Sequence, residues 1–177
     1  MSTTITEVTE CFEYLFSSLY RKAFVKTLRL NECSERELLP LVRCYLLGWF
    51  ADSVSPEVRG KLPGSISGHG YIDFVIDDVA VEFAVRKPGA ARSALSASVN
   101  STEVKKLMKY DGKALLVLFD FSDTPYTEEQ IESFRNWPSL GRGNHRKSAF
   151  NVAYFFVEKR SPLTPVTNGA KLIHPSG

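Results

Sequence analysis

The sequence has little of what several common functional sites require. Its 177 residues include only three cysteines and three histidines, and none of them has the spacing of a metal site. Three scattered cysteines also argue against a disulfide framework and favour reduced thiols in the cytoplasm. The chain has neither a phosphate-binding glycine loop nor a Ser-His-Asp arrangement. Enzyme classes that depend on either motif therefore find little support in the sequence.

Long hydrophobic runs are absent as well. The most apolar helical stretch is interrupted by Arg43, and the first residues are acidic rather than basic. We therefore expect neither a membrane span nor a signal peptide. Hydrophobic residues make up 44% of the chain, which is enough for the core of one domain. We expect that domain to cover residues 1–160, with a flexible, proline-containing tail over 161–177.

Charge of one sign is not in excess, because the net charge is only +2. Its distribution is uneven, since residues 84–113 and 135–160 each carry a local net charge of +5. Two such basic segments favour a polyanionic partner. Ordinary solvated surface is the alternative interpretation.

The most strongly patterned stretch is residues 71–87, where apolar residues alternate along two arms. This period of two predicts a β-hairpin. Asp77 and Asp78 are the only interruption and predict a two-residue turn. With that turn Asp73 and Glu82 face each other across the hairpin, with Cβ atoms roughly 5 Å apart.

Two like charges in that position destabilise a sheet, so we expect positive charge between Asp73 and Glu82. Mg²⁺ takes oxygen ligands and is commonly held by one or two carboxylates, so a metal ion would serve. Arg86 would also serve, because it projects from the same face as Glu82. The alternative is an exposed network of these acids and Arg86, which would contribute little energy.

Further helices and strands are expected on both sides of the hairpin. The run at 113–120 is apolar throughout, as in a central strand covered on both faces. Strand, helix and strand follow one another there, which favours parallel pairing and an α/β fold. The expected helices are 6–28 (or two shorter ones), 35–51, 103–110 and 127 to about 137, and the other expected strands are a short one near 64–66 and one at 150–158.

Two polar residues near the hairpin have structural explanations that compete with functional ones. Glu37 lies three residues after Ser34 and fits a capping box, in which its carboxylate bonds the N-cap amide. His69 would face Arg86 if the hairpin pairing continued that far. A lone histidine in a glycine-containing loop is more often a surface residue.

Basic residues suited to phosphate contacts occur in two places. We expect Lys105, Lys106 and Lys109 to point outward from the helix at 103–110. The second group lies in the glycine-containing loop 141–148, for which a solvated turn is an equal alternative, and consists of Arg142, Arg146 and Lys147.

The order of these features resembles the core of the PD-(D/E)XK nuclease superfamily, which has the restriction-endonuclease-like fold. The resemblance covers residues 35–120: a helix, a hairpin carrying Asp73 and then Glu82, a basic helix ending in Tyr110, and a buried strand. It implies a three-layer core with a mixed central sheet. It also implies that Asp73 and Glu82 bind Mg²⁺ or Mn²⁺.

One motif position departs from that family. The family has a lysine two residues after the second acid, where this chain has Ala84. The resemblance leaves its role in orienting water and stabilising charge to Arg86, Lys87 or Lys106. Arg86 would be a poor base because its guanidinium stays protonated.

Two further features of the resemblance concern helices. Lys106 and Tyr110 are similar to the Gln-x-x-x-Tyr helix of some branches, with Lys106 in place of Gln. An additional acid from the preceding helix often joins the site in that family. Glu37 or Glu35 would fill that role here.

The expected function is therefore metal-dependent hydrolysis of a phosphodiester in DNA, a preference that comes from the family alone. Lys105, Lys109 and the basic loop 141–148 would hold the nucleic acid backbone. The resemblance also makes a homodimer possible. The alternative is a catalytically inactive protein of the same fold that binds nucleic acid or a protein partner.

Overall fold

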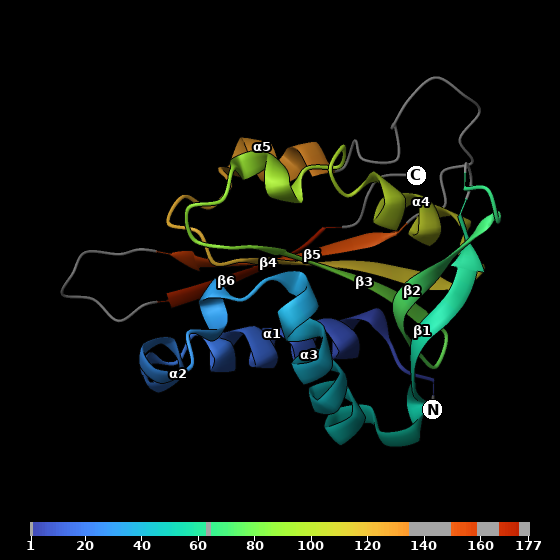
Figure 1. Cartoon of the computed structure of the whole chain (residues 1–177), viewed down its shortest axis with the longest axis horizontal. Coiled ribbons are helices and arrows are strands. Elements are labelled where there is room, and N and C mark those ends of the chain that lie inside the picture. The colour runs from blue at the N-terminus through green and yellow to red at the C-terminus, as the bar shows by residue number, and fades with distance from the viewer. Residues whose placement is uncertain (1, 63–64, 135–149, 159–166, 174–177) are drawn as a thin grey trace.

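The computed structural model describes residues 2–62, 65–134, 150–158 and 167–173. Its helices are α1 (Ile5–Leu19), α2 (Lys22–Thr27), α3 (Glu35–Phe50), α4 (Ser101–Lys109) and α5 (Glu128–Glu132). Its strands are β1 (Val54–Lys61), β2 (His69–Ile76), β3 (Val79–Arg86), β4 (Lys113–Asp120), β5 (Asn151–Glu158) and β6 (Thr167–Ile173). Figure 1 shows three layers, with α1, α2 and α3 on one face of the sheet and α4 and α5 on the other. The predicted α/β fold with a mixed central sheet flanked by helices is confirmed.

The first helix forms where the sequence provides a cap. Thr4 and Glu7 make a capping box before α1, because the Glu7 carboxylate accepts from Thr4 N at 2.7 Å and Glu7 N donates to Thr4 Oγ1 at 3.2 Å. The helical pattern over 6–28 divides into α1 and α2, as its second interpretation had it. Among the described residues, none of the helices combines the length and the hydrophobicity that a membrane span requires.

The six strands lie in the order β1-β2-β3-β4-β5-β6. The predicted hairpin is present, with Ile76 opposite Val79 and Phe74 opposite Val81. Strands β3, β4 and β5 run parallel, whereas β1–β2, β2–β3 and β5–β6 are antiparallel. The parallel pairing of the strands before and after α4 was predicted from the strand, helix and strand order.

Two strands differ from the sequence-based expectations. The strand before the hairpin is β1 at Val54–Lys61 rather than 64–66, since Ser65 and Ile66 lie in a turn. Strand β6 pairs with β5 within the segment expected to be a flexible tail. The helix expected to end near residue 137 begins as α5, but residues 135–149 lie outside the described ranges.

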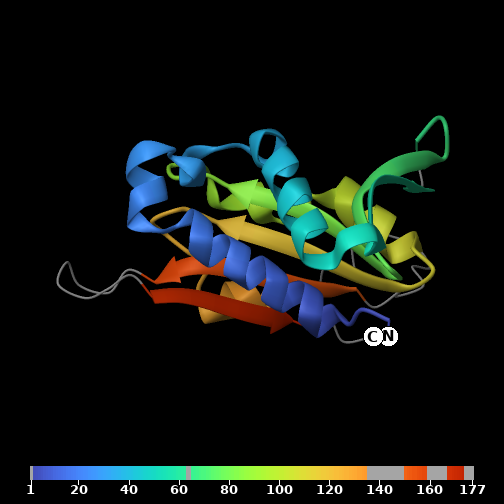
Figure 2. The ribbon, with the colours of Figure 1, turned by 90° about the horizontal axis from the view of Figure 1, so that it is seen from below.

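The sheet separates two apolar cores. Below it, α1 and α3 lie side by side, with α1 under β4, β5 and β6 and α3 nearer β1 and β3 (Figure 2). Above it, α4 and α5 pack over the other face, where Leu107, Leu116 and Tyr154 are fully buried. Strands β3 and β4 are covered on both faces, which explains why the second arm of the hairpin and the run 113–120 are almost entirely buried.

Candidate functional site

The strands diverge at Asp73. The ladder between β2 and β3 includes Phe74 and Val81 but not the next pair, Asp73 and Glu82. On the other side of β2, Glu57 and Asp73 do not pair although their neighbours do, and Glu57 has a φ of 52°. In place of a ladder bond, Phe83 N donates to Asp73 Oδ2 at 2.9 Å. Asp73 and Glu82 thus lie beyond the end of the ladder, but their side chains remain neighbours, because the charge of Asp73 raises the pKa of Glu82 and the two carboxyl groups are within hydrogen-bonding reach.

This divergence places Asp73 between the two cores. Phe74 packs into the core below the sheet, whereas Ile72 packs into the core above it. Residues two apart on a regular strand share a face, so the strand turns between them. Asp73 consequently lies close to helices of both layers. Its charge raises the pKa of Glu35 on α3, and the charge of Lys106 on α4 lowers the pKa of Asp73.

Lys106 supplies the cation at this site. Its Nζ donates to Glu82 Oε2 at 2.7 Å and to the backbone oxygen of Tyr71 at 2.6 Å. The side chain of Lys106 is buried, so the prediction that it points outward from its helix is wrong. Lys106 is nevertheless one of the residues expected to take over from the missing lysine at position 84, and Ala84 is packed into the upper core.

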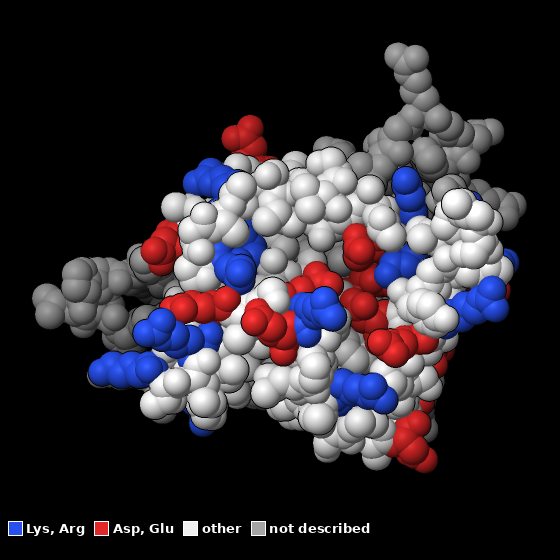
Figure 3. Space-filling view, viewed as in Figure 1, with Lys and Arg blue, Asp and Glu red and all other residues white. Residues whose placement is uncertain are grey.

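Acids outnumber this buried cation. Burial, together with the charge of Asp73, raises the pKa of Glu82 to about 9. Burial also raises the pKa of Glu35 to about 7, with contributions from Asp73 and Glu103. The pKa of Asp73 is raised by burial as well, although the bond from Phe83 N and the charge of Lys106 oppose this. Figure 3 shows acidic side chains gathered on the face between α3 and α4.

One carboxylate oxygen of the site lacks a hydrogen-bond donor in the part of the chain that the structure describes. Glu82 Oε1 is buried and accepts no hydrogen bond from a donor among the described residues, and the acid Asp73 lies beside this carboxyl group. This arrangement is costly unless a proton or another group satisfies the oxygen. No group of three or more His, Cys, Asp and Glu side chains within the described ranges is arranged as a metal site. The donor set of Asp73 and Glu82, with Glu35 beside them, is nevertheless composed of oxygen ligands with excess negative charge. Such a set fits Mg²⁺ or Mn²⁺.

The remaining predicted site residues lie elsewhere. The exposed Glu37 accepts from Ser34 N at 2.6 Å, as its capping interpretation predicted, so Glu35 rather than Glu37 approaches Asp73. Lys87 is exposed, and its charge lowers the pKa of Glu37 rather than that of Glu82. Lys105 and Lys109 are exposed on α4, and Arg142, Arg146 and Lys147 lie outside the described residues.

His69 and Arg86 are not neighbours in the structure. His69 pairs with Lys61 of β1, and its Nδ1 lies 2.8 Å from the backbone oxygen of Ser67 and 3.4 Å from Arg59 Nη2. The expectation that His69 faces Arg86 is therefore wrong.

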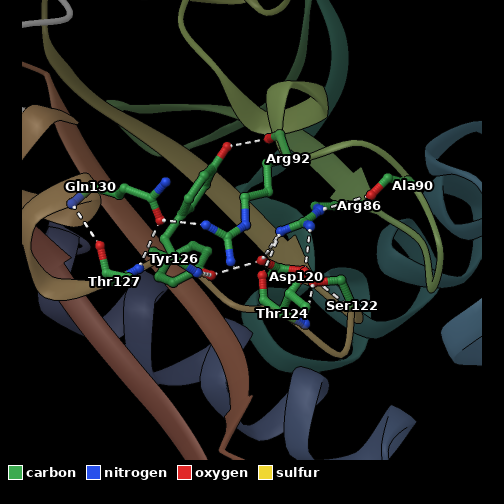
Figure 4. A network of polar contacts seen from close by, with 10 residues as sticks. Arg86, Ala90, Arg92, Asp120, Ser122, Thr124, Tyr126, Thr127 and Gln130 are labelled. Atoms are coloured by element: carbon green, nitrogen blue, oxygen red, sulfur yellow. Dashed lines mark hydrogen bonds and ion pairs between the residues drawn. The ribbon is translucent and has the colours of Figure 1, made fainter.

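Arg86 belongs to a buried network above the sheet (Figure 4). Its Nη1 donates to Asp120 Oδ2 at 3.0 Å, and its Nη2 donates to Thr124 Oγ1 at 3.0 Å. Asp120 also accepts from Tyr154 Oη at 2.7 Å and from Ser122 N at 2.9 Å. These contacts pair Arg86 with Asp120, its register neighbour on β4, rather than with Asp73 and Glu82.

Removing Asp120 is expected to destabilise the fold strongly. An Asp120→Ala variant leaves the Arg86 guanidinium, which is 1% exposed, without its carboxylate, at a cost of about 3–5 kcal/mol in the free energy of unfolding. Urea denaturation followed by circular dichroism measures this loss. Asp111→Ala, at an exposed position, is the control and should change stability by no more than about 0.5 kcal/mol. Equal stability of the two variants would contradict a structural role for the network.

The sequence patterns pointed to Asp73, Glu82 and Lys106, whereas Glu35 was only an alternative to Glu37 and Glu103 had no predicted role. The capping position of Glu37 was the available signal in favour of Glu35. A carboxylate that is bonded to Ser34 is held away from the hairpin. No family model matches the chain, and no curated protein or solved structure is found to be similar to it.

Proposed function

We propose that this protein is a metal-dependent phosphodiester hydrolase, a nuclease that acts on DNA. The observation that carries the proposal is the buried contact of 2.7 Å between Lys106 Nζ and Glu82, beside Asp73, at the point where β2 and β3 diverge. Carboxylates with raised pKa values beside a lysine are typical of catalytic sites. The order of elements from α3 to β4, with β3 and β4 parallel, is the order on which the resemblance to PD-(D/E)XK nucleases rests.

Asp73 and Glu82 would hold Mg²⁺ or Mn²⁺, with Glu35 as the additional acid. When bound, such an ion lowers the pKa of water and neutralises charge on a phosphate. Glu35 has a pKa near neutrality, so its carboxyl group is suited to accept or donate a proton at physiological pH. The ordered bond from Phe83 N fixes the orientation of the Asp73 carboxylate.

One N–H donor of the Lys106 ammonium group is not used by any described residue. An ammonium group carries three N–H donors, and within the described residues Lys106 Nζ uses one on Glu82 and one on the Tyr71 backbone oxygen. The third is available to a water molecule or to a phosphate oxygen. A positioned cation at a phosphate stabilises the negative charge that develops in the transition state.

The catalytically inactive alternative assumed that hydrolysis was lost with the lysine at position 84. An amine that contacts Glu82 and acts on Asp73 supports hydrolysis instead, because Lys106 supplies from α4 the charge that Ala84 lacks. The exposed Lys105 and Lys109 lie on the same helix and would contact the backbone of the substrate without recognising bases.

The proposal predicts metal-dependent cleavage that requires Asp73. Purified protein is incubated with circular plasmid, linear duplex, single-stranded DNA and RNA in Mg²⁺, in Mn²⁺ and in EDTA. Asp73→Asn should abolish cleavage because it removes a ligand charge at nearly unchanged volume. Asp52→Asn, at an exposed position outside the site, should cleave at the wild-type rate. Cleavage by Asp73→Asn equal to that of the wild type would sink the proposed function.

A further inference from the structure

A pocket of about 370 Å³ opens beside the proposed catalytic carboxylates, between α3 and the strands β1 and β2. Asp73 belongs to its lining, so the pocket is continuous with the site. The volume is within the range of small-ligand sites.

One wall of the pocket is a stripe along α3. Arg36, Leu39, Pro40 and Arg43 follow the i, i+3, i+4, i+7 spacing of a single helix face. The two arginines are seven residues apart, or about 10 Å along the helix axis. Both are exposed, and neither makes an ion pair or hydrogen bond with another described residue. Their guanidinium groups are therefore available to a bound anion.

The rest of the lining has a different chemistry. Leu39 and Pro40 lie between the two arginines on α3 and, with Pro56 and Phe74 from the strands, provide apolar surface, whereas Asp73 and Glu57 provide carboxylates. A nucleotide matches this combination: its base offers flat apolar faces, its phosphates are anionic, and its sugar and base carry groups that donate to carboxylates.

We propose that this pocket holds a single unstacked nucleotide next to the scissile phosphate, with Arg36 and Arg43 bound to the flanking phosphates. The inference rests on the proposed function and narrows its substrate to DNA with unpaired bases, such as single strands, single-stranded overhangs and junctions. A base stacked inside a duplex cannot enter a recess in a protein without being extruded, which costs free energy. Intact duplex is therefore the poorer ligand.

Arginine variants test the anion contacts without relying on cleavage. Binding of a fluorescent single-stranded oligonucleotide is measured by anisotropy in EDTA for the wild type, Arg36→Gln and Arg43→Gln. Each variant should bind roughly tenfold more weakly, because a charged hydrogen bond is lost. The slope of log affinity against log salt should fall by about 0.7 for each arginine removed. Arg21→Gln, which removes an exposed arginine outside the pocket, is the matched control.

Cys44 gives a second readout that needs no substitution at the arginines. Cys44 is exposed and lines the pocket, whereas Cys11 is fully buried and its pKa is raised to about 12, so its thiol is unreactive. In a Cys33→Ser background, saturating single-stranded oligonucleotide should slow maleimide labelling of Cys44 several-fold. Blunt duplex of the same sequence should slow it less.

The outcomes separate this inference from the proposed function. Weaker binding by both pocket variants, together with protection of Cys44, supports the nucleotide pocket even if no substrate is cleaved. Unchanged binding and an unprotected Cys44 overturn it, and they do so even where the wild-type protein cleaves DNA. Equal protection by blunt duplex and single strand overturns the preference for an unstacked nucleotide.

Discussion

Replacing Lys106 with methionine is expected to lower the rate of metal-dependent cleavage by about 100- to 1,000-fold, the usual cost of removing one preorganised donor to a developing charge. Methionine keeps the apolar stem that packs between α4 and the sheet but lacks the ammonium group. The contacts with Glu82 and with the Tyr71 backbone oxygen are then lost. The rate is measured under single-turnover conditions, so that binding and product release do not mask the effect.

A matched variant on the same helix separates the effect of a charge inside the site from the effect of a charge on the surface. Lys109 is exposed on α4, and Lys109→Met should weaken substrate binding slightly while leaving the single-turnover rate within a few-fold of wild type. Lys106→Arg tests the role further, because arginine keeps a positive charge but does not exchange a proton. Thermal unfolding of each variant shows whether the fold is retained. A folded Lys106→Met protein that cleaves as fast as Lys109→Met would show that Lys106 has no catalytic role.

The sequence predicted the hairpin and the buried strand because their signals are local. Alternation along residues 71–87, interrupted only at Asp77 and Asp78, specifies both arms and the turn, and the structure pairs Phe74 with Val81 accordingly. A continuous apolar run likewise predicts β4 as a strand covered on both faces. These elements are specified by residues that are close together in the chain.

The candidate site was predicted less completely, because its contacts join distant residues. Helical periodicity placed Lys106 outside the apolar stripe of Val104, Leu107 and Met108, but its long side chain extends inward to Glu82, 24 residues away. Arg86 contacts Asp120 because the two residues are paired in register between the neighbouring strands β3 and β4. Neither partner follows from periodicity.

The hairpin register predicts only part of the geometry at Asp73 and Glu82. Extending the register places Asp73 opposite Glu82, and their carboxyl groups do interact. The ladder nevertheless stops one pair earlier, and Phe83 N donates to Asp73 Oδ2. Glu57, with its positive φ, lies opposite Asp73 on β1. A local departure of this kind depends on the packing of α3 and α4 against the strands, so the alternating pattern does not contain it.

Metal binding is expected to depend strongly on pH. In the absence of metal, Glu82 has a pKa of about 9 and Glu35 of about 7, so both hold protons over part of the neutral range. A divalent cation requires ionised carboxylates and must displace those protons. Affinity for Mg²⁺ should therefore rise with pH between about 6 and 9, by about tenfold per pH unit for each proton released.

The same pKa values set the pH dependence of stability without metal. The ordinary pKa of Glu82 is 4.5, and its value in the fold is about 9. Between these values the folded state binds more protons than the unfolded state. The contribution of Glu82 to the free energy of unfolding therefore declines as pH rises through this window. Mg²⁺ should offset the decline, because it binds the folded state.

Titration calorimetry of Mg²⁺ binding tests the central claim, that Asp73 and Glu82 hold a divalent cation. Wild type, Asp73→Asn and the exposed control Asp52→Asn are titrated at pH 6, 7 and 8, each in two buffers of different ionisation enthalpy. We expect wild type and Asp52→Asn to bind Mg²⁺ with an affinity that rises with pH and with release of protons, and we expect Asp73→Asn to lose this binding. Equal affinity in all three proteins, or no binding to the wild type at pH 8, would contradict it.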